Sequence, residues 1–184
     1  DYGRWQAAGG KELDAYLARL AQPWAAGLPP EARKAALINA YNALTVRWVL
    51  QHYPTRSIWQ TDHPFTAERH RVGGRKVSLD AIETELRNMG DPRVHAVLVC
   101  AARSCPPLRR EAYTADRLEA QLDDNTRAWL ANQALNEFPA RRLARVSMIF
   151  QWYRQDFERG GNSLPKFLAR YAPPQAAAFL REGN

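Results

Sequence analysis

The chain has 184 residues, a hydrophobic share of 46% and a charged share of 24%. This length and balance are typical of one packed core and exclude a disordered chain, and no apolar run approaches the roughly 20 residues that a membrane-spanning helix needs. The net charge of +7 favours anionic partners, but the arginines are scattered and no recognition helix, RNP-like strand or zinc-finger spacing accompanies them, so we expect no specific nucleic acid partner.

Helical patterns dominate the first part of the chain. Residues 11–22 place three leucines at helical spacing. A much longer helix is predicted over 30–53, between a proline-then-acid start and Pro54. Its residues are apolar on nearly every face, which is typical of a helix in the middle of a domain. Asn39 and Asn42 share one face of this helix, so both amides are expected in or beside the core.

A short hairpin is predicted over residues 70–79. Gly73 and Gly74 accept the positive φ angles of a tight turn between its two strands. Ser78 then has the position of an N-cap for a helix over 79–87.

Residues 93–100, "RVHAVLVC", have the pattern of the strongest strand in the chain. They are β-branched and apolar on both faces, which favours an interior strand. In such a strand His95 and Cys100 would point to opposite faces.

The rest of the chain completes an α+β fold. A long helix is expected from Thr114 to Leu130, and the remaining expected elements are a strand pair over 134–139 and 142–148 and three closing helices over 149–157, 164–171 and 175–182. The prediction is a mostly helical single domain over 1–184, with a long central helix and a small β-sheet.

The segment "VHAVLVCAARSCPPL", residues 94–108, contains both cysteines. Cys105 is either a catalytic thiolate, half of a disulfide with Cys100, or a packed residue at the end of a strand. It follows an apolar run on a turn closed by two prolines, which is a common place for a catalytic thiol, and Arg103 beside it would lower the thiol pKa. Cys100 at the end of the apolar run also suits a small buried hydrophobe.

His95 is the candidate general base, and Glu83 on the preceding helix is its candidate partner. The structural alternatives are a core histidine and a solvent-facing glutamate. A fully extended strand would separate His95 from Cys105 by roughly 30 Å, so a catalytic pair requires the chain after Cys100 to double back.

Asn39 and Asn42 have two alternative roles. Their amides either polarise a substrate carbonyl or lock the central helix to loop backbone, since an unbonded buried amide is costly. The other histidines lack the spacing of a zinc site, so we expect no metal and no cofactor.

Four stretches carry a resemblance to a known family: "INAYNALTVRWVL", "SLDAIETELR", "DPRVHAVLVCAARSCPPLRREAYTADRLEAQLDD" and "VSMIFQWYRQDF". In this order they resemble the bacterial and plant family called domain of unknown function 547, over roughly residues 30–160, which leaves 161–184 as a helical closure. Bacterial members are typically exported, so the resemblance implies a periplasmic or secreted protein. Similar members often have a histidine where this chain has Thr84, and if that histidine were essential this chain would be inactive.

We therefore expect an exported cysteine-dependent hydrolase or acyl transferase that acts on amide or peptide bonds, similar in residue roles to papain-like and transglutaminase-like enzymes. Cys105 would attack the carbonyl, His95 would act as base, and Glu83 would orient the imidazole. The groups expected at the substrate or its oxyanion are Asn39, Asn42 and Arg103. The alternative is a non-catalytic envelope binding or scaffold module with a structural His/Cys/Asn network. The substrate, a small molecule or peptide, and the oligomeric state stay open.

Overall fold

A computed structural model describes residues 2–7, 10–101, 104–139 and 143–182 of the chain. The helices and strands in these ranges are α1 (Tyr2–Ala7), α2 (Lys11–Leu20), α3 (Pro30–Gln51), η1 (Ile58–Gln60), β1 (His70–Val72), β2 (Arg75–Val77), α4 (Leu79–Asn88), η2 (Pro92–Ala96), α5 (Leu118–Ala131), α6 (Ile149–Trp152), α7 (Arg154–Glu158), η3 (Arg159–Gly161), α8 (Leu164–Tyr171) and α9 (Pro174–Glu182), where η marks a 3-10 helix. The prediction of a mostly helical α+β fold with a small antiparallel sheet is confirmed. None of the described helices has the length and apolar character needed to cross a membrane.

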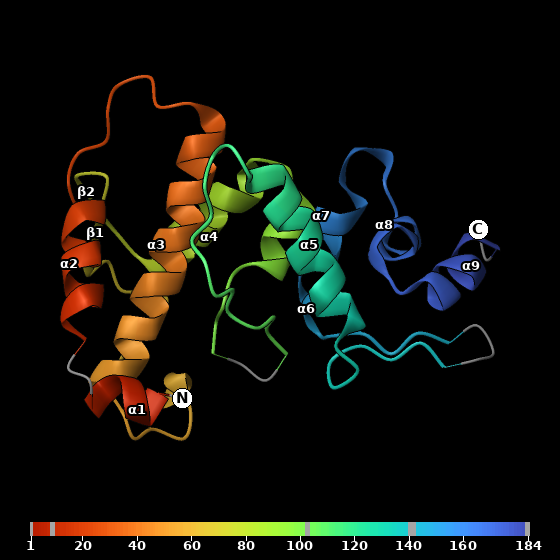
Figure 1. The fold of residues 1–184 in the computed structure, drawn as a ribbon, viewed down its shortest axis with the longest axis horizontal. Coiled ribbons are helices and arrows are strands. Elements are labelled where there is room, and N and C mark those ends of the chain that lie inside the picture. The colour runs from red at the N-terminus through yellow and green to blue at the C-terminus, as the bar shows by residue number, and fades with distance from the viewer. Residues whose placement is uncertain (1, 8–9, 102–103, 140–142, 183–184) are drawn as a thin grey trace.

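Helix α3 is the long central helix that the sequence predicts. It packs against α1, α2 and α4, and its buried residues occur on all faces rather than along one stripe. Figure 1 shows α2 and the hairpin on one side of α3, with α4 and α5 on the other. Pro30 occupies the first turn, where its missing N–H costs no hydrogen bond, and the helix ends before Pro54.

The hairpin forms around the two predicted glycines, with His70 opposite Val77 and Val72 opposite Arg75. Gly73 has a φ of +57°, and a Cβ there would lie 3.0 Å from Cδ2 of Trp24, so both its conformation and its surroundings require glycine. The Gly73 N–H donates to the carbonyl of Leu20, which fixes the turn to the end of α2.

The predicted strand over 93–100 is wrong. Asp91 caps a 3-10 turn by accepting from the N–H of Arg93, η2 ends at Ala96, and the chain continues to Cys100 without regular structure. Side-chain amides, instead of a neighbouring strand, form hydrogen bonds with its backbone. Asn125 donates to the carbonyl of Ala96, and Asn42 donates to the carbonyl of Val97 and accepts from the N–H of Val99. Residues 94–99 are all buried, and this complete burial gives them the continuous apolar composition that resembles an interior strand.

Three further predictions need correction. The strand pair over 134–139 and 142–148 is reduced to one bridge between Glu137 and Arg145, and residues 140–142 lie outside the described ranges. The helix expected from Thr114 begins at Leu118. The helix expected over 149–157 is divided into α6 and α7 at Tyr153, which has a φ of −113°.

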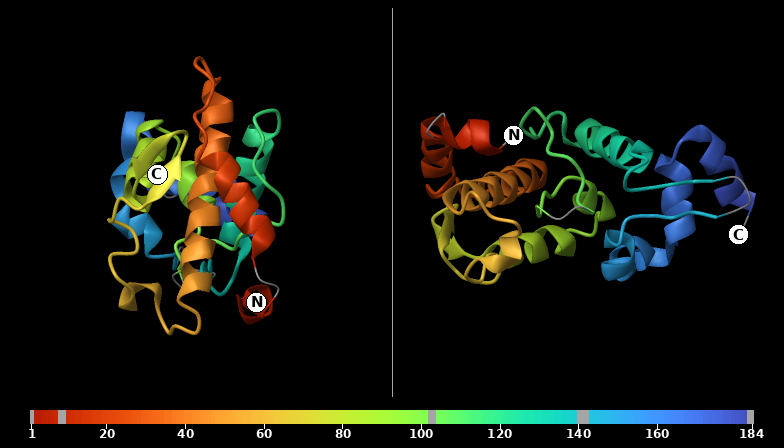
Figure 2. Two further views of the ribbon diagram at one scale, coloured as in Figure 1. Left: turned by 90° about the vertical axis from the view of Figure 1, so that its left-hand side faces the viewer. Right: turned by 90° about the horizontal axis from the view of Figure 1, so that it is seen from below.

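The apolar side chains form two cores, and the described residues 94–101 and 104–105 lie where the two cores meet. The first core surrounds α3 and α4 and contains Val94 and Leu98, while the second lies among α5 to α9 and contains Ala96 and Cys105. Cys100 packs against both cores. The right-hand view in Figure 2 shows this arrangement, with the N-terminal helices at one end, the C-terminal helices at the other and the green segment in the middle.

Candidate functional site

A cleft of about 650 Å³ lies where the two cores meet. Its lining consists of Tyr41 from α3, Trp59 and residues 61–66 from the connection before β1, Asp80 and Glu83 from α4, His95, Leu98, Cys100 and Cys105 from the segment after α4, and Ile149, Trp152 and Tyr153 from α6 and its C-cap. The three predicted catalytic residues, Glu83, His95 and Cys105, therefore line one cleft. The objection from a fully extended strand does not apply, because the described residues between His95 and Cys105, 95–101 and 104–105, form no strand.

His95 is buried, with 4% of its surface exposed, and its imidazole is held by Asp156 of α7. The distance from Nε2 to the Asp156 Oδ2 is 2.9 Å. The ring of Tyr153 stacks on the imidazole with centroids 4.3 Å apart, and Phe157 lies on the imidazole as well. Asp156, rather than the expected Glu83, is the carboxylate that orients His95.

Arg87 supports the same carboxylate. Its Nε donates to the Asp156 Oδ2 over 2.6 Å, and its guanidinium lies over the Tyr153 ring, 4.7 Å from the centroid. Burial disfavours the ionised form of Asp156, but hydrogen bonds from Arg87 and His95 hold its pKa below the ordinary value. Burial lowers the pKa of His95 to about 4, against the opposing effect of Asp156. At neutral pH a neutral imidazole thus donates its Nε2–H to an ionised carboxylate, which leaves Nδ1 as the basic nitrogen.

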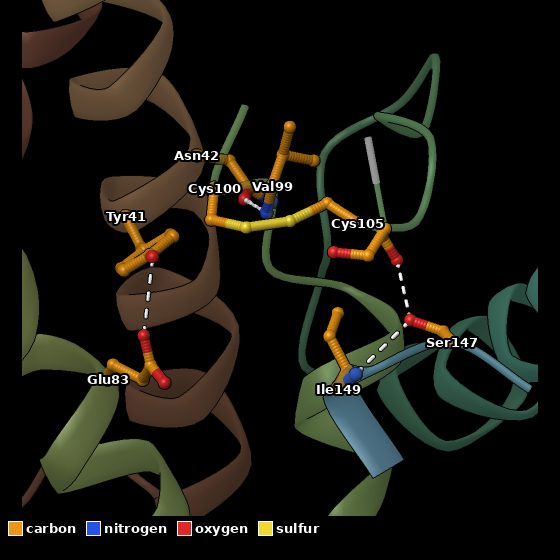
Figure 3. The surroundings of a disulfide bond; sticks show 9 residues. Tyr41, Asn42, Glu83, Val99, Cys100, Cys105, Ser147 and Ile149 are labelled. Atoms are coloured by element: carbon orange, nitrogen blue, oxygen red, sulfur yellow. Dashed lines mark hydrogen bonds between the residues drawn. A yellow bond between two sulfur atoms is a disulfide. The ribbon is translucent and has the colours of Figure 1, made fainter. Parts of the chain in front are cut away.

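Cys100 and Cys105 form a disulfide, with Cα atoms 6.2 Å apart, so neither cysteine of the chain is free. Figure 3 shows the bond running from Cys100, beside α3, toward the side of the cleft where Ser147 and Ile149 lie. Ser147 donates to the carbonyl of Ser104 over 2.9 Å and so ties the Cys105 turn to the start of α6. Of the three alternatives for Cys105, the structure has the disulfide.

Glu83 faces a pair of tyrosines. The Tyr41 hydroxyl donates to the Glu83 Oε2 over 3.3 Å, as drawn in Figure 3. Burial first, and then the Glu83 charge, raise the pKa of both Tyr41 and Tyr153, so both hydroxyls stay protonated. The next residue, Thr84, is exposed and is not part of the cleft lining.

Asn39 and Asn42 lie outside this cleft. Asn42 uses both ends of its amide on the backbone, donating to Val97 and accepting from Val99, each over 2.8 Å. Asn39 holds the carbonyl and N–H of Tyr113 in the same way, over 2.8 and 2.9 Å. Both asparagines border a second cavity of about 250 Å³. The amides thus brace two loops, which is the structural role that the sequence left open.

Two further expectations concern Arg103 as a substrate-binding group and the absence of a metal site. Arg103 lies outside the described residues. Within the described ranges, no three or more histidine, cysteine, aspartate or glutamate side chains are grouped so that they could hold a metal ion.

Asp156 is the residue of the candidate site that sequence reasoning missed. Its signal is a carboxylate three residues after Tyr153 and seven after Ile149, which places it on the apolar face of the predicted helix over 149–157. A charged residue on that face needs a buried partner, and His95 and Arg87 supply it.

Comparison with known proteins is consistent with the motifs. No curated protein and no solved structure matches the chain. A family model described as "Protein of unknown function, DUF547" matches residues 25–130, more than half of the chain. The matched segment contains Glu83, His95 and both cysteines of the cleft. The chain therefore belongs to the DUF547 family.

Proposed function

We propose that the chain is a cysteine-dependent hydrolase or acyl transferase that acts on amide or peptide bonds, with the cleft as its active site. The observation that supports this most is that Cys105 and His95 line the same cleft and that Asp156 hydrogen-bonds to the His95 imidazole. A nucleophile, a base and a group that orients the base are the parts that thiol catalysis of acyl transfer requires.

The proposed reaction begins with reduction of the disulfide by a dithiol, which is oxidised in exchange and leaves two thiols. His95 accepts the Cys105 proton, and the thiolate adds to the substrate carbonyl carbon. The imidazolium then donates its proton to the leaving amine as the carbon–nitrogen bond breaks. Water or a second amine displaces the thiolate from the thioester, which gives hydrolysis or transfer. Asp156 orients the imidazole and stabilises its charge throughout, and Asn42 positions the segment that carries Cys100.

A periplasmic or secreted location is part of this proposal. Disulfides persist mainly in oxidising compartments, so the Cys100–Cys105 bond supports the location that the family resemblance implies.

A non-catalytic binding module is the second candidate, and the disulfide is the observation that favours it. Both thiols are consumed, and the amides of Asn39 and Asn42 are used to hold loops. In that case the cleft binds a ligand without transforming it.

The two candidates differ in the reactivity of Cys105 once Cys100 is absent. The Cys100→Ala variant leaves Cys105 as a permanent free thiol, and Cys105→Ala is the matched control that leaves Cys100. We would measure iodoacetamide alkylation against pH for both variants, confirm the modified residue by mass spectrometry, and assay release of p-nitroaniline from a set of peptide anilides.

The enzyme proposal expects Cys105 to ionise below the ordinary thiol pKa of about 8.5. His95→Gln in the same background should return the thiol to ordinary behaviour, and Cys100→Ala should release p-nitroaniline while Cys105→Ala does not. Equal alkylation profiles for the two thiols, without anilide cleavage, would leave the binding module as the function.

A further inference from the structure

Among the described residues that line the cleft, the charged side chains are all acidic. Its described lining contains the carboxylates of Asp62, Asp80 and Glu83 but no lysine or arginine, although the chain has 26 basic residues and a net charge of +7. The buried histidine of the cleft is neutral at pH 7, since burial lowers the pKa of His95 to about 4. The cleft is thus locally acidic in a basic protein.

Two of these carboxylates, Asp80 and Glu83, are not neutralised by an ion pair with a described residue, although the charge of Arg87, one turn beyond Glu83 on α4, attracts the Glu83 carboxylate. Among the described residues, no lysine or arginine lies within ion-pair distance of Asp80 or Glu83, and Glu83 accepts hydrogen bonds from the neutral hydroxyls of Tyr41 and Tyr153. Their neighbour on α4, Glu85, shows the usual arrangement in this protein, because Arg33 and Arg75 both pair with it. The first turn of α4 offers some stabilisation to Asp80, but it does not extend to Glu83 further along the helix.

Aromatic side chains at the cleft provide a second and independent observation. Trp59 is 69% exposed and Trp152 is 59% exposed, yet both line the cleft, from η1 and α6 respectively. Phe65 lies against Trp59 with ring centroids 4.8 Å apart. Aromatic side chains gathered at a cleft are typical of ligand sites, and among the aromatic rings the indole face attracts cations most strongly.

We propose that the cleft recognises an organic cation, the ammonium or guanidinium group of a lysine or arginine side chain, through the carboxylates of Asp80 and Glu83 and the indoles of Trp59 and Trp152. The alkyl stem of such a side chain packs on the aromatic and aliphatic lining, and the charged end reaches the carboxylates. This inference names the substrate class of the proposed active site and rests on the proposed function for the identity of that site. Ligand binding itself requires no catalysis and is measurable on the oxidised protein.

The test is isothermal titration calorimetry of the oxidised protein with four blocked tripeptides of sequence Ala-X-Ala, where X is lysine, arginine, norleucine or glutamate. We expect the lysine and arginine peptides to bind, with affinity that falls as salt is raised, and the norleucine and glutamate peptides to bind at least about ten-fold more weakly. Glu83→Gln, Asp80→Asn and Trp59→Ala should each lower the affinity for the lysine peptide several-fold. The matched control is Glu12→Gln, which removes one exposed carboxylate from α2, an element that does not line the cleft.

Several outcomes would overturn the inference. These are equal affinity for the norleucine and lysine peptides, an unchanged affinity in both Glu83→Gln and Asp80→Asn, absence of binding by every peptide, and binding of a neutral oligosaccharide in place of the cationic peptides. The alkylation and anilide assays report on the proposed function separately. A reactive Cys105 with no preference for cationic peptides would refute only the substrate class, and cation binding with an unreactive Cys105 would refute only the enzyme.

Discussion

The Asn42 brace is predicted to be one of the largest single contributions to the stability of the cleft. Asn42→Ala removes two hydrogen bonds of 2.8 Å, and it leaves the carbonyl of Val97 and the N–H of Val99 buried without a partner. An orphaned buried backbone group costs on the order of 1–3 kcal/mol, so the two together predict a loss of about 2–6 kcal/mol in the free energy of unfolding. That is a large share of the roughly 5–15 kcal/mol that stabilises a typical domain. Urea denaturation of the oxidised protein, followed by circular dichroism, measures the loss.

Two further variants make this prediction specific. Asn39→Ala should cost less, because the hydrogen bonds between Asn39 and Tyr113 are only partly buried. Asn42→Asp keeps an acceptor for the Val99 N–H but sets a carboxylate against the Val97 carbonyl, which raises the pKa of the new side chain. Its destabilisation should therefore be largest at neutral pH and shrink on acidification, as the protonated carboxyl regains a donor. A cost below about 1 kcal/mol for Asn42→Ala, or a pH-independent cost for Asn42→Asp, would show that the brace does not hold the segment in the way described.

Three other predictions concern His95, the disulfide and the hairpin turn. Because the pKa of His95 is about 4 in the folded protein against an ordinary value of 6.5, the unfolded chain binds more protons between these values, and stability should fall as pH drops from 6.5 to 4, by up to about 3 kcal/mol for this histidine. Urea titrations of His95→Gln should therefore show a flatter pH profile than wild type; His70→Gln, which removes the other histidine whose pKa burial lowers to about 4, should flatten the profile as well, and an unchanged profile in His95→Gln would contradict the prediction. The disulfide closes a loop with a sequence separation of 5, so Cys100→Ser should lower the free energy of unfolding by about 2 kcal/mol, the loop-closure entropy of the unfolded chain. A urea midpoint equal to that of wild type would contradict this prediction. Gly73→Ala should lower the free energy of unfolding by about 1–2 kcal/mol for the positive φ, and by a further amount for the contact of the new Cβ with Trp24. Gly27→Ala is the control, because Gly27 also has a positive φ but has no neighbour within 4 Å of an added Cβ. Equal shifts in thermal unfolding temperature for the two variants would show that the contact with Trp24 does not matter.

Local chemistry accounts for the elements that the sequence predicted. Pro30 and Pro54 mark the ends of the longest helix, since proline is tolerated in a first turn and not within a helix. Gly73 and Gly74 specify the hairpin turn, and Ser78 caps α4 by accepting from the Ala81 N–H. Each of these signals acts over a few residues and needs no knowledge of the rest of the fold.

The prediction of a strand at 93–100 failed for a different reason, because the structure of this segment depends on contacts with residues far away in sequence. Continuous apolar composition indicates burial on all sides, but it does not distinguish a central strand from irregular chain buried between two cores. The decision depends on partners far away in sequence, because Asn42 and Asn125 supply the backbone hydrogen bonds that a neighbouring strand would have supplied. The same limit applies to Asp156, which lies 61 residues from the histidine that it holds.

The candidate site extends beyond the segment that defines the family. Residues 25–130 supply His95 and Glu83, whereas the Asp156 that orients the imidazole lies on α7 and the Tyr153 that stacks on it is the residue that precedes α7. A buried neutral imidazole needs an acceptor for its N–H, so His95 is complete only when the later segment packs against the earlier one. The second core has the same requirement, since Trp129 near the end of the matched segment is buried by Phe150 from α6. The unit that can carry either proposed function therefore includes residues 149–157, and members of the family should share the chemistry of this cleft where their later segment supplies an equivalent carboxylate and aromatic ring.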